Sequence, residues 1–210
     1  IIKVITNYFD VAGYGQYAQV YEYLAYFAIV SDLGLFTIAV REMAKDREKI
    51  SFIIGNILTV RFIVAILALG AGVVAVFWIP QYAETQVAKG VAIAAVGIFI
   101  TILQGTTSSV LQVYLRMGVA AVALVCGKIA TLLYILYVVY VLLPHDPVAG
   151  FSQIMWAGVI GAVVMNLITS LYVRKLTPWR FRCDIDFWKK VILRSLPYGI
   201  ALILNNVYFR

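Results

Sequence analysis

Three ionisable side chains stand inside otherwise hydrophobic stretches of this sequence: Asp32, Arg61 and Lys128. At the rise of an α-helix, Asp32 lies roughly 13 Å from Arg41, and Arg61 and Lys128 each lie roughly 18 Å from the nearest charged connection. Charges at such depth in a membrane are costly unless they are paired or hydrated. Arg61 and Lys128 are therefore candidate substrate-binding cations for an anion such as a phosphate. Asp32 is a candidate ion-coupling group or structural pair partner.

Two interpretations of these charges stay open at the level of the sequence. In the first, Asp32 and Arg61 lie on sequential antiparallel helices and form a buried pair that fixes the hairpin. In the second, a water-filled cavity reaches the three charges, and polar side chains line it. The predicted lining residues are Gln104 and Ser108, one turn apart on one helix face, and Asn166 on a later helix. Hydrogen bonding between helices is the plainer explanation of these polar positions.

Other kinds of chemistry have little support in the sequence. The chain has one histidine, His145, which falls in a turn between hydrophobic stretches, and its two cysteines, Cys126 and Cys183, form no metal-binding spacing. Nucleophilic catalysis by serine or cysteine would lack a histidine base. We therefore expect no enzyme activity, no cofactor, no metal site and no nucleic-acid binding.

The composition shows which elements must position the three charges. Hydrophobic residues make up 63% of the chain and charged residues 13%, about half the usual share in soluble domains. Stretches of about 20 apolar residues are long enough to span a bilayer as helices. They are predicted at 17–40, 59–79, 91–112, 119–143 and 154–173. The fold class is therefore all-α, a polytopic membrane protein.

The connections between these stretches predict the topology. Lysine and arginine are frequent in 41–50, 113–118 and 174–194 and nearly absent from 80–89 and 144–153. Because basic residues favour cytoplasmic loops, the first three connections are predicted inside and the other two outside. Membrane lipids with anionic headgroups are the expected partners of the basic loops.

A long stretch resembles a known family: "GYGQYAQVYEYLAYFAIVSDLGLFTIAVREMAKDREKISFIIGNILTVRF". Its glycine-tyrosine entry, "DLGL", "VRE" and "GN" followed by an arginine are similar to polysaccharide (O-antigen, Wzx-type) flippases of the multidrug/oligosaccharidyl-lipid/polysaccharide exporter superfamily. The ending "SLPYGIALILNNVYFR" is similar to the start of that family's seventh helix. The matching positions are Asp32, Gly34, Arg41, Gly55, Asn56 and Arg61, of which the two glycines are expected to be packing residues.

The resemblance implies a transporter of two six-helix bundles, of which this chain would be the N-terminal bundle. Residues 1–180 would run from the end of helix 1 through helix 6. Residues 181–194 would form an amphipathic linker on the inner membrane surface, with Phe187 and Trp188 on its apolar side. Residues 195–210 would begin helix 7. On this interpretation the chain is a fragment, cut in helices at both ends.

The resemblance also implies an activity, the flipping of a lipid-linked oligosaccharide across the cell (cytoplasmic) membrane for cell-surface polysaccharide biosynthesis. Alternating access of a cationic central cavity would carry the sugar and phosphate. H⁺ or Na⁺ are candidate coupling ions, and polysaccharide assembly enzymes are candidate partners.

The tyrosines near the outer end, Tyr17 and Tyr21 among them, are explained by an interfacial aromatic belt, with sugar stacking as the alternative.

Three alternatives remain beside the flippase. A multidrug or cation antiporter of the same superfamily should place more acids than bases in its cavity. A membrane enzyme of polysaccharide assembly usually needs a larger catalytic region than these short outer connections provide. A structural scaffold would leave the deep charges without a role.

Overall fold

Helices make up all the regular structure in the part of the chain that the computed structural model describes, residues 6, 9, 11–79, 82, 85–142 and 150–208. Five stretches within it are long and apolar enough to cross a membrane. The elements are α2 (Val11–Asp32), α3 (Leu35–Lys45), the 3₁₀ turn η1 (Arg47–Lys49), α4 (Ile50–Trp78), α6 (Gln86–Val113), α7 (Met117–Tyr137), the π-helical turn η2 (Val138–Leu142), α8 (Gly150–Leu176) and α9 (Ile185–Tyr208).

The predicted all-α membrane fold is confirmed, and each predicted span has a helical counterpart. The helical stretches are longer than the apolar cores that predicted them, because helices continue into the polar ends of the bundle. The stretch predicted at 91–112, for example, lies within Gln86–Val113. The predicted tail of an earlier span at 1–9 lies outside the described residues except for Thr6 and Phe9. Half of the two predicted outer connections, residues 80, 81, 83, 84 and 144–149, lies outside them as well, and His145 is among these residues.

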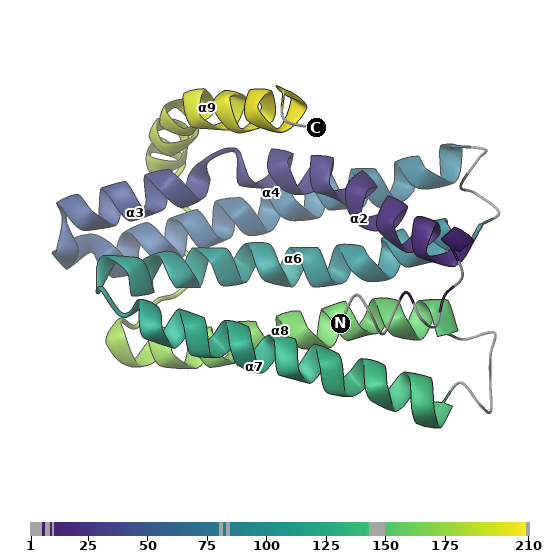
Figure 1. Cartoon of the computed structure of the whole chain (residues 1–210). Coiled ribbons are helices and arrows are strands. Elements are labelled where there is room, and N and C mark those ends of the chain that lie inside the picture. The colour runs from purple at the N-terminus through teal and green to yellow at the C-terminus, as the bar shows by residue number, and fades with distance from the viewer. Residues whose placement is uncertain are drawn as a thin grey trace.

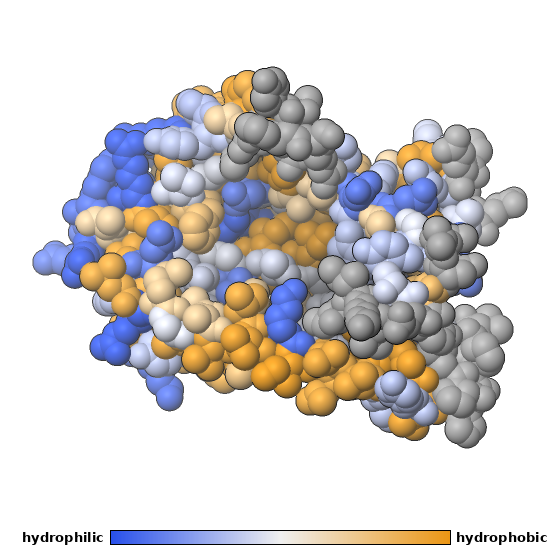
Figure 2. All heavy atoms as spheres, in the orientation of Figure 1, coloured by the Kyte–Doolittle hydropathy of each residue, from blue (hydrophilic) through white to orange (hydrophobic). Residues whose placement is uncertain are grey.

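The long helices lie side by side, and their connections alternate between the two ends of the bundle (Figure 1). The basic connections α3–α4, α6–α7 and α8–α9 share one end, as the charge pattern predicts. Figure 2 shows hydrophilic side chains gathered at that end and hydrophobic ones over α7. Helix α6 is central, packing against α2, α4 and α8, whereas α7 packs mainly against α8.

Two apolar cores are stacked along the bundle. The inner core, toward the basic end, joins α3, the start of α4 and the end of α6 through residues such as Ile38, Ile54 and Leu111. The outer core joins α2, the end of α4 and the start of α6 through residues such as Leu24 and Val91. The polar residues of α6 that are buried, such as Thr106, lie in sequence between the two cores. The bundle therefore has a polar layer between two apolar ones.

The first span is not one continuous helix. It is interrupted at Leu33 and Gly34, which have φ of 43° and 74°, in the left-handed region. A β-carbon on Gly34 would lie 2.6 Å from Cβ of Tyr198 on α9, so both the backbone conformation and the close approach favour glycine. The packing role predicted for Gly34 is therefore only half of its function, since it also allows the turn between α2 and α3.

Helix α9 begins on a docking site formed by α4. The side-chain oxygen of Asn56 accepts hydrogen bonds from the backbone N–H of Asp184 at 2.8 Å and from Trp188 Nε1 at 3.1 Å. Asp184 in turn caps α9 by accepting from the N–H of Phe187 at 3.0 Å. One residue before Asn56, Gly55 lies directly against the backbone carbonyl of Arg180. The adjacent Gly55 and Asn56 thus hold the α8–α9 connection.

The structure joins the predicted linker and the predicted start of the next span in one helix. Helix α9 runs through Pro197 without ending. Phe187 and Trp188 pack against the inner core, beside the buried Val191. The apolar side of this segment therefore contacts α3 and α4, and its placement on a membrane surface stays a prediction.

The topology predicts which introduced cysteines share a side of the membrane. In a background without Cys126 and Cys183, Lys45→Cys and Arg116→Cys should react with an impermeant maleimide from one face, and Gln86→Cys from the other. All three positions are exposed in the structure. Labelling of positions 45 and 86 from the same face would contradict the span assignment.

The Gly55 contact predicts opposite effects for two substitutions in one helix. Gly55→Ala should destabilise the protein by about 1–3 kcal/mol, because its methyl group would overlap the Arg180 carbonyl. Gly70→Ala is the matched control, since nothing lies within 4 Å of its β-carbon position. Alanine favours a helix over glycine by about 1 kcal/mol, so this variant should be neutral or stabilised. Thermal unfolding in detergent measures both, and equal melting temperatures would contradict the docking role of Gly55.

Candidate functional site

Asp32 and Arg61 form an ion pair inside the bundle, with the Arg61 guanidinium against the Asp32 carboxylate. Arg61 is 3% exposed, and its other terminal nitrogen donates a hydrogen bond of 2.8 Å to the hydroxyl of Thr106 on α6. The Asp32 side chain is 28% exposed, so the pair is open on the side of the acid. The pair predicted from the depth of the two residues is present, and it joins α2, α4 and α6.

The guanidinium of Arg61 is not fully satisfied. Its Nε is buried and has no hydrogen-bond partner among the described residues. A buried N–H of a charged group without a partner costs free energy. The pair with Asp32 and the bond to Thr106 are therefore the contacts that compensate for burial of this charge.

Of the predicted polar lining residues, Gln104 joins α6 to α8, whereas Asn166 bonds within α8. Gln104 is buried and donates a hydrogen bond of 3.4 Å to the Thr169 hydroxyl. Asn166 accepts a hydrogen bond of 3.1 Å from Ser170 within α8. Ser108 is half-buried on α6. The contacts of Gln104 and Asn166 are those expected for residues that hydrogen-bond within and between helices.

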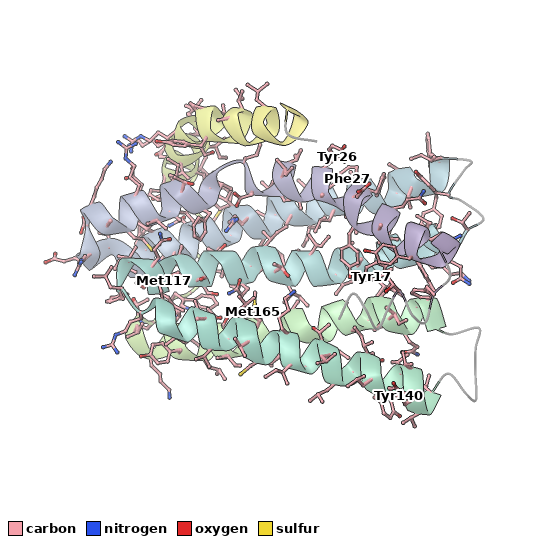
Figure 3. All side chains as sticks on the ribbon, in the orientation of Figure 1. Tyr17, Tyr26, Phe27, Met117, Tyr140 and Met165 are labelled. Atoms are coloured by element: carbon pink, nitrogen blue, oxygen red, sulfur yellow. The ribbon has the colours of Figure 1, made fainter. Side chains whose placement is uncertain are left out.

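Lys128 occupies a different environment, a cleft between α2, α6, α7 and α8. The cleft has a volume of about 360 Å³, and its lining is mostly apolar. Tyr17 of α2 and Met165 of α8, both labelled in Figure 3, come from different walls of it. Lys128 is exposed, and no ion pair joins it to an acid in the part of the chain that the structure describes. It contributes a positive charge to a cleft that has no acidic residue among the described residues that line it.

The structure therefore divides the three predicted charges between two environments. Arg61 pairs with Asp32 and is not among the residues that line the cleft, and neither are Gln104, Ser108 and Asn166. The expectation that Arg61 and Lys128 act together, with those three residues beside them, does not describe this cleft. Arg61 does not reach the cleft because it is buried and projects into the interior between α2 and α6.

Other polar members of the cleft were not among the predicted site residues, although sugar stacking was an alternative role for Tyr17 and Tyr21. These members are Thr101 on α6 and Thr131 on α7, with the hydroxyl-bearing rings of Tyr17 and Tyr21 on α2. Thr131 follows Lys128 by almost one helical turn, and this spacing was the available signal that both share a face. The two tyrosine rings lie 5.0 Å apart between centroids and form an aromatic side of the cleft.

A family model described as "Polysaccharide biosynthesis protein" matches residues 1–210. This chain belongs to that family. Searches of curated proteins and of solved structures gave no match. Together with the five spans, family membership makes the protein a multi-pass membrane protein with a role in polysaccharide synthesis or export.

The Asp32–Arg61 pair predicts an asymmetric mutational cycle. Asp32→Asn should destabilise more than Arg61→Met, because the buried guanidinium cannot lose its proton, whereas a partly exposed carboxylate can be hydrated or protonated. Removing one partner of a buried pair typically costs about 3–5 kcal/mol. The double variant should recover much of the Asp32→Asn loss, as measured by thermal unfolding in detergent. Additive losses in the double variant would show that the two side chains do not depend on each other.

Proposed function

We propose that this protein exports a lipid-linked oligosaccharide for cell-surface polysaccharide biosynthesis by flipping it across the cytoplasmic membrane. The observation that carries the proposal is Lys128, an exposed cation with no ion pair among the described residues, which lines a mostly apolar cleft between α2, α6, α7 and α8. A phosphate or pyrophosphate group is the anion that links lipid and glycan in such a substrate. It would supply the negative charge that Lys128 lacks.

The composition of the cleft suits this substrate class. A volume of about 360 Å³ is within the range of small-molecule sites, roughly 300–1,000 Å³. This volume matches a phosphate with the first groups attached to it, rather than a whole glycan. The apolar walls from α7 and α8 would contact the lipid, and the threonine and tyrosine hydroxyls would hydrogen-bond polar groups of the substrate. Alternating access would then expose this site to each side of the membrane in turn.

The charge of the site favours an anionic substrate over the multidrug or cation antiporter. Among the described residues, one base and no acid line the cleft, while the deep acid Asp32 is already paired with Arg61. In the proposal Asp32 remains the candidate coupling residue for H⁺ or Na⁺, because its side chain is partly exposed. Polysaccharide assembly enzymes and membrane lipids are the proposed partners.

Transport is proposed rather than catalysis, without a metal or cofactor. A membrane enzyme of polysaccharide assembly would most often place a histidine or an acid at the bound phosphate or sugar as its general base. The described residues that line this cleft are of neither type. Lysine is then best explained as a binding group, since an ammonium can hold a phosphate as a point charge.

The proposal predicts a graded effect at position 128. Lys128→Ala should lower export of the lipid-linked oligosaccharide about ten-fold or more, since a hydrogen bond to a charged group contributes roughly 1.5–3 kcal/mol. Lys128→Arg should keep part of the activity because the charge remains. Export is measured with radiolabelled lipid-linked oligosaccharide in inverted membrane vesicles, normalised to protein abundance.

Lys89→Ala is the matched control, because Lys89 is an exposed lysine on α6 that does not line the cleft. It should leave export unchanged. Normal export by Lys128→Ala would contradict the substrate role of Lys128. Equal losses from Lys89→Ala and Lys128→Ala would show a general need for surface charge rather than a site.

A further inference from the structure

The interruption of the first span is covered by α9. Gly34 lies against Tyr198, and a β-carbon on Gly199 would lie 3.1 Å from the backbone of Leu33. Ser195, one helical turn before Gly199, is 1% exposed at the same contact. Two glycines and a small polar residue therefore allow α9 to approach the α2–α3 backbone closely, next to the end of α2 where Asp32 stands.

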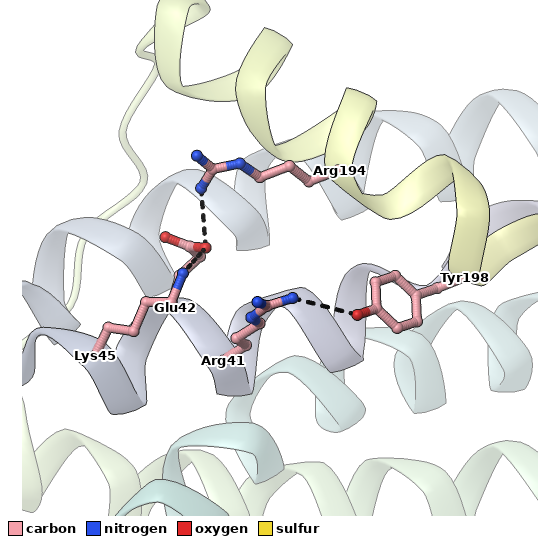
Figure 4. Close-up of polar contacts among 5 residues, drawn as sticks. All are labelled: Arg41, Glu42, Lys45, Arg194 and Tyr198. Atoms are coloured by element: carbon pink, nitrogen blue, oxygen red, sulfur yellow. Dashed lines mark hydrogen bonds and ion pairs between the residues drawn. The ribbon is translucent and has the colours of Figure 1, made fainter.

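Two polar contacts hold α9 on α3 at the surface, as Figure 4 shows. Arg194 donates to the Glu42 carboxylate at 3.0 Å, and Arg41 donates to the Tyr198 hydroxyl at 3.3 Å. Lys45 also reaches Glu42, at 3.2 Å, and can replace Arg194 as its partner when α9 moves away. Both contacts are exposed, so each is weak and readily exchanged with water.

The first turns of α9 are held far more firmly than its later turns. Asn56 binds the start of the helix, and Val191 is buried in the inner core. Beyond them, Leu193, Ile200 and Leu204 are exposed. Pro197 cannot donate a backbone hydrogen bond to the carbonyl of Leu193, so the helix is weakened between these two residues and favours a bend there. Helix α9 bends along its length in Figure 1.

We infer that Arg41, Glu42, Arg194 and Tyr198 form a latch that holds the second half of α9 over the helix break. With the start of α9 fixed on α4, the turns that follow Leu193, Arg194 and Ser195 included, swing away when the latch opens. This movement uncovers Leu33 and Gly34 and widens access to Asp32, whose side chain is already 28% exposed. Only the purpose of the latch, which is to gate the side of the basic connections, rests on the proposed function.

Ser195→Cys reports the opening directly, because the side chain is covered only while α9 lies on α3. The parent for the experiment is the full-length protein with Cys126→Ala, Cys183→Ser and Ser195→Cys in proteoliposomes. The rate of maleimide labelling is measured without any substrate. Glu42→Gln should raise this rate about two- to five-fold, the effect expected from loss of an exposed ion pair. Exchanging the charges, Glu42→Arg with Arg194→Glu, should return the rate toward that of the parent.

Lys49→Gln is the matched control for charge at this end of the bundle. Lys49 pairs with Asp46 at 2.7 Å, but this pair does not reach α9. Lys49 hydrogen-bonds the Asp46 carboxylate and thereby lowers the pKa of Asp46, so the control pair is ionised near neutral pH. Lys49→Gln should not change labelling of position 195. Gly34→Ala should raise labelling strongly, because its methyl group would overlap Tyr198.

Each contrary result overturns the latch. Unchanged labelling in Glu42→Gln would mean that the ion pair does not hold α9, and fast labelling in the charge-exchanged protein would mean that pairing is irrelevant. Unchanged labelling in Gly34→Ala would mean that α9 does not separate from the break. Since no substrate is present, these outcomes are independent of the export measured for Lys128 variants, and either proposal can fail alone.

Discussion

The burial of the Arg61 guanidinium is the constraint on which the arrangement of the bundle depends. A guanidinium keeps its proton under all ordinary conditions, so a protein that buries it must bring an opposite charge to it. Asp32 is that charge, and Thr106 adds a hydrogen bond from a third helix. One side chain thereby sets the relative positions of α2, α4 and α6. The apolar cores on either side reduce the access of water to this layer, apart from the partly exposed Asp32 carboxylate, and strengthen the interactions within it.

The interruption after Asp32 follows from the same region of the chain. A carboxylate at the C-terminal end of α2 is unfavourable to the helix dipole, and Arg61 offsets this cost. Leu33 and Gly34 then turn the chain into α3, which carries Arg41 and Glu42 to the side that α9 approaches. The geometry of two helices therefore depends on a short segment that also forms the ion pair. A change at Gly34 affects the hairpin and the docking of α9 together.

The two basic side chains at mid-depth have different roles because their surroundings differ. Arg61 is paired with Asp32 within the bundle and stabilises it. Lys128 has no ion-pair partner among the described residues, so its positive charge in the cleft is not compensated by them. Membership of a polysaccharide biosynthesis family is compatible with several activities, since a fold does not define a function. The distribution of charge within the bundle is what favours an anionic substrate.

The sequence alone determined the spans, their alternating connections and the depth of Asp32, Arg61 and Lys128. These features depend on the length of apolar stretches and the positions of basic residues, both of which can be read along a single chain. It also allowed the Asp32–Arg61 pair to be predicted as one of two interpretations. Only the tertiary structure decided that Gln104 faces α8, that Lys128 faces the cleft and that the first span breaks at Gly34. The rotation of a helix about its axis is set by packing against its neighbours, and the break is stabilised by α9, which lies more than 150 residues later in the chain.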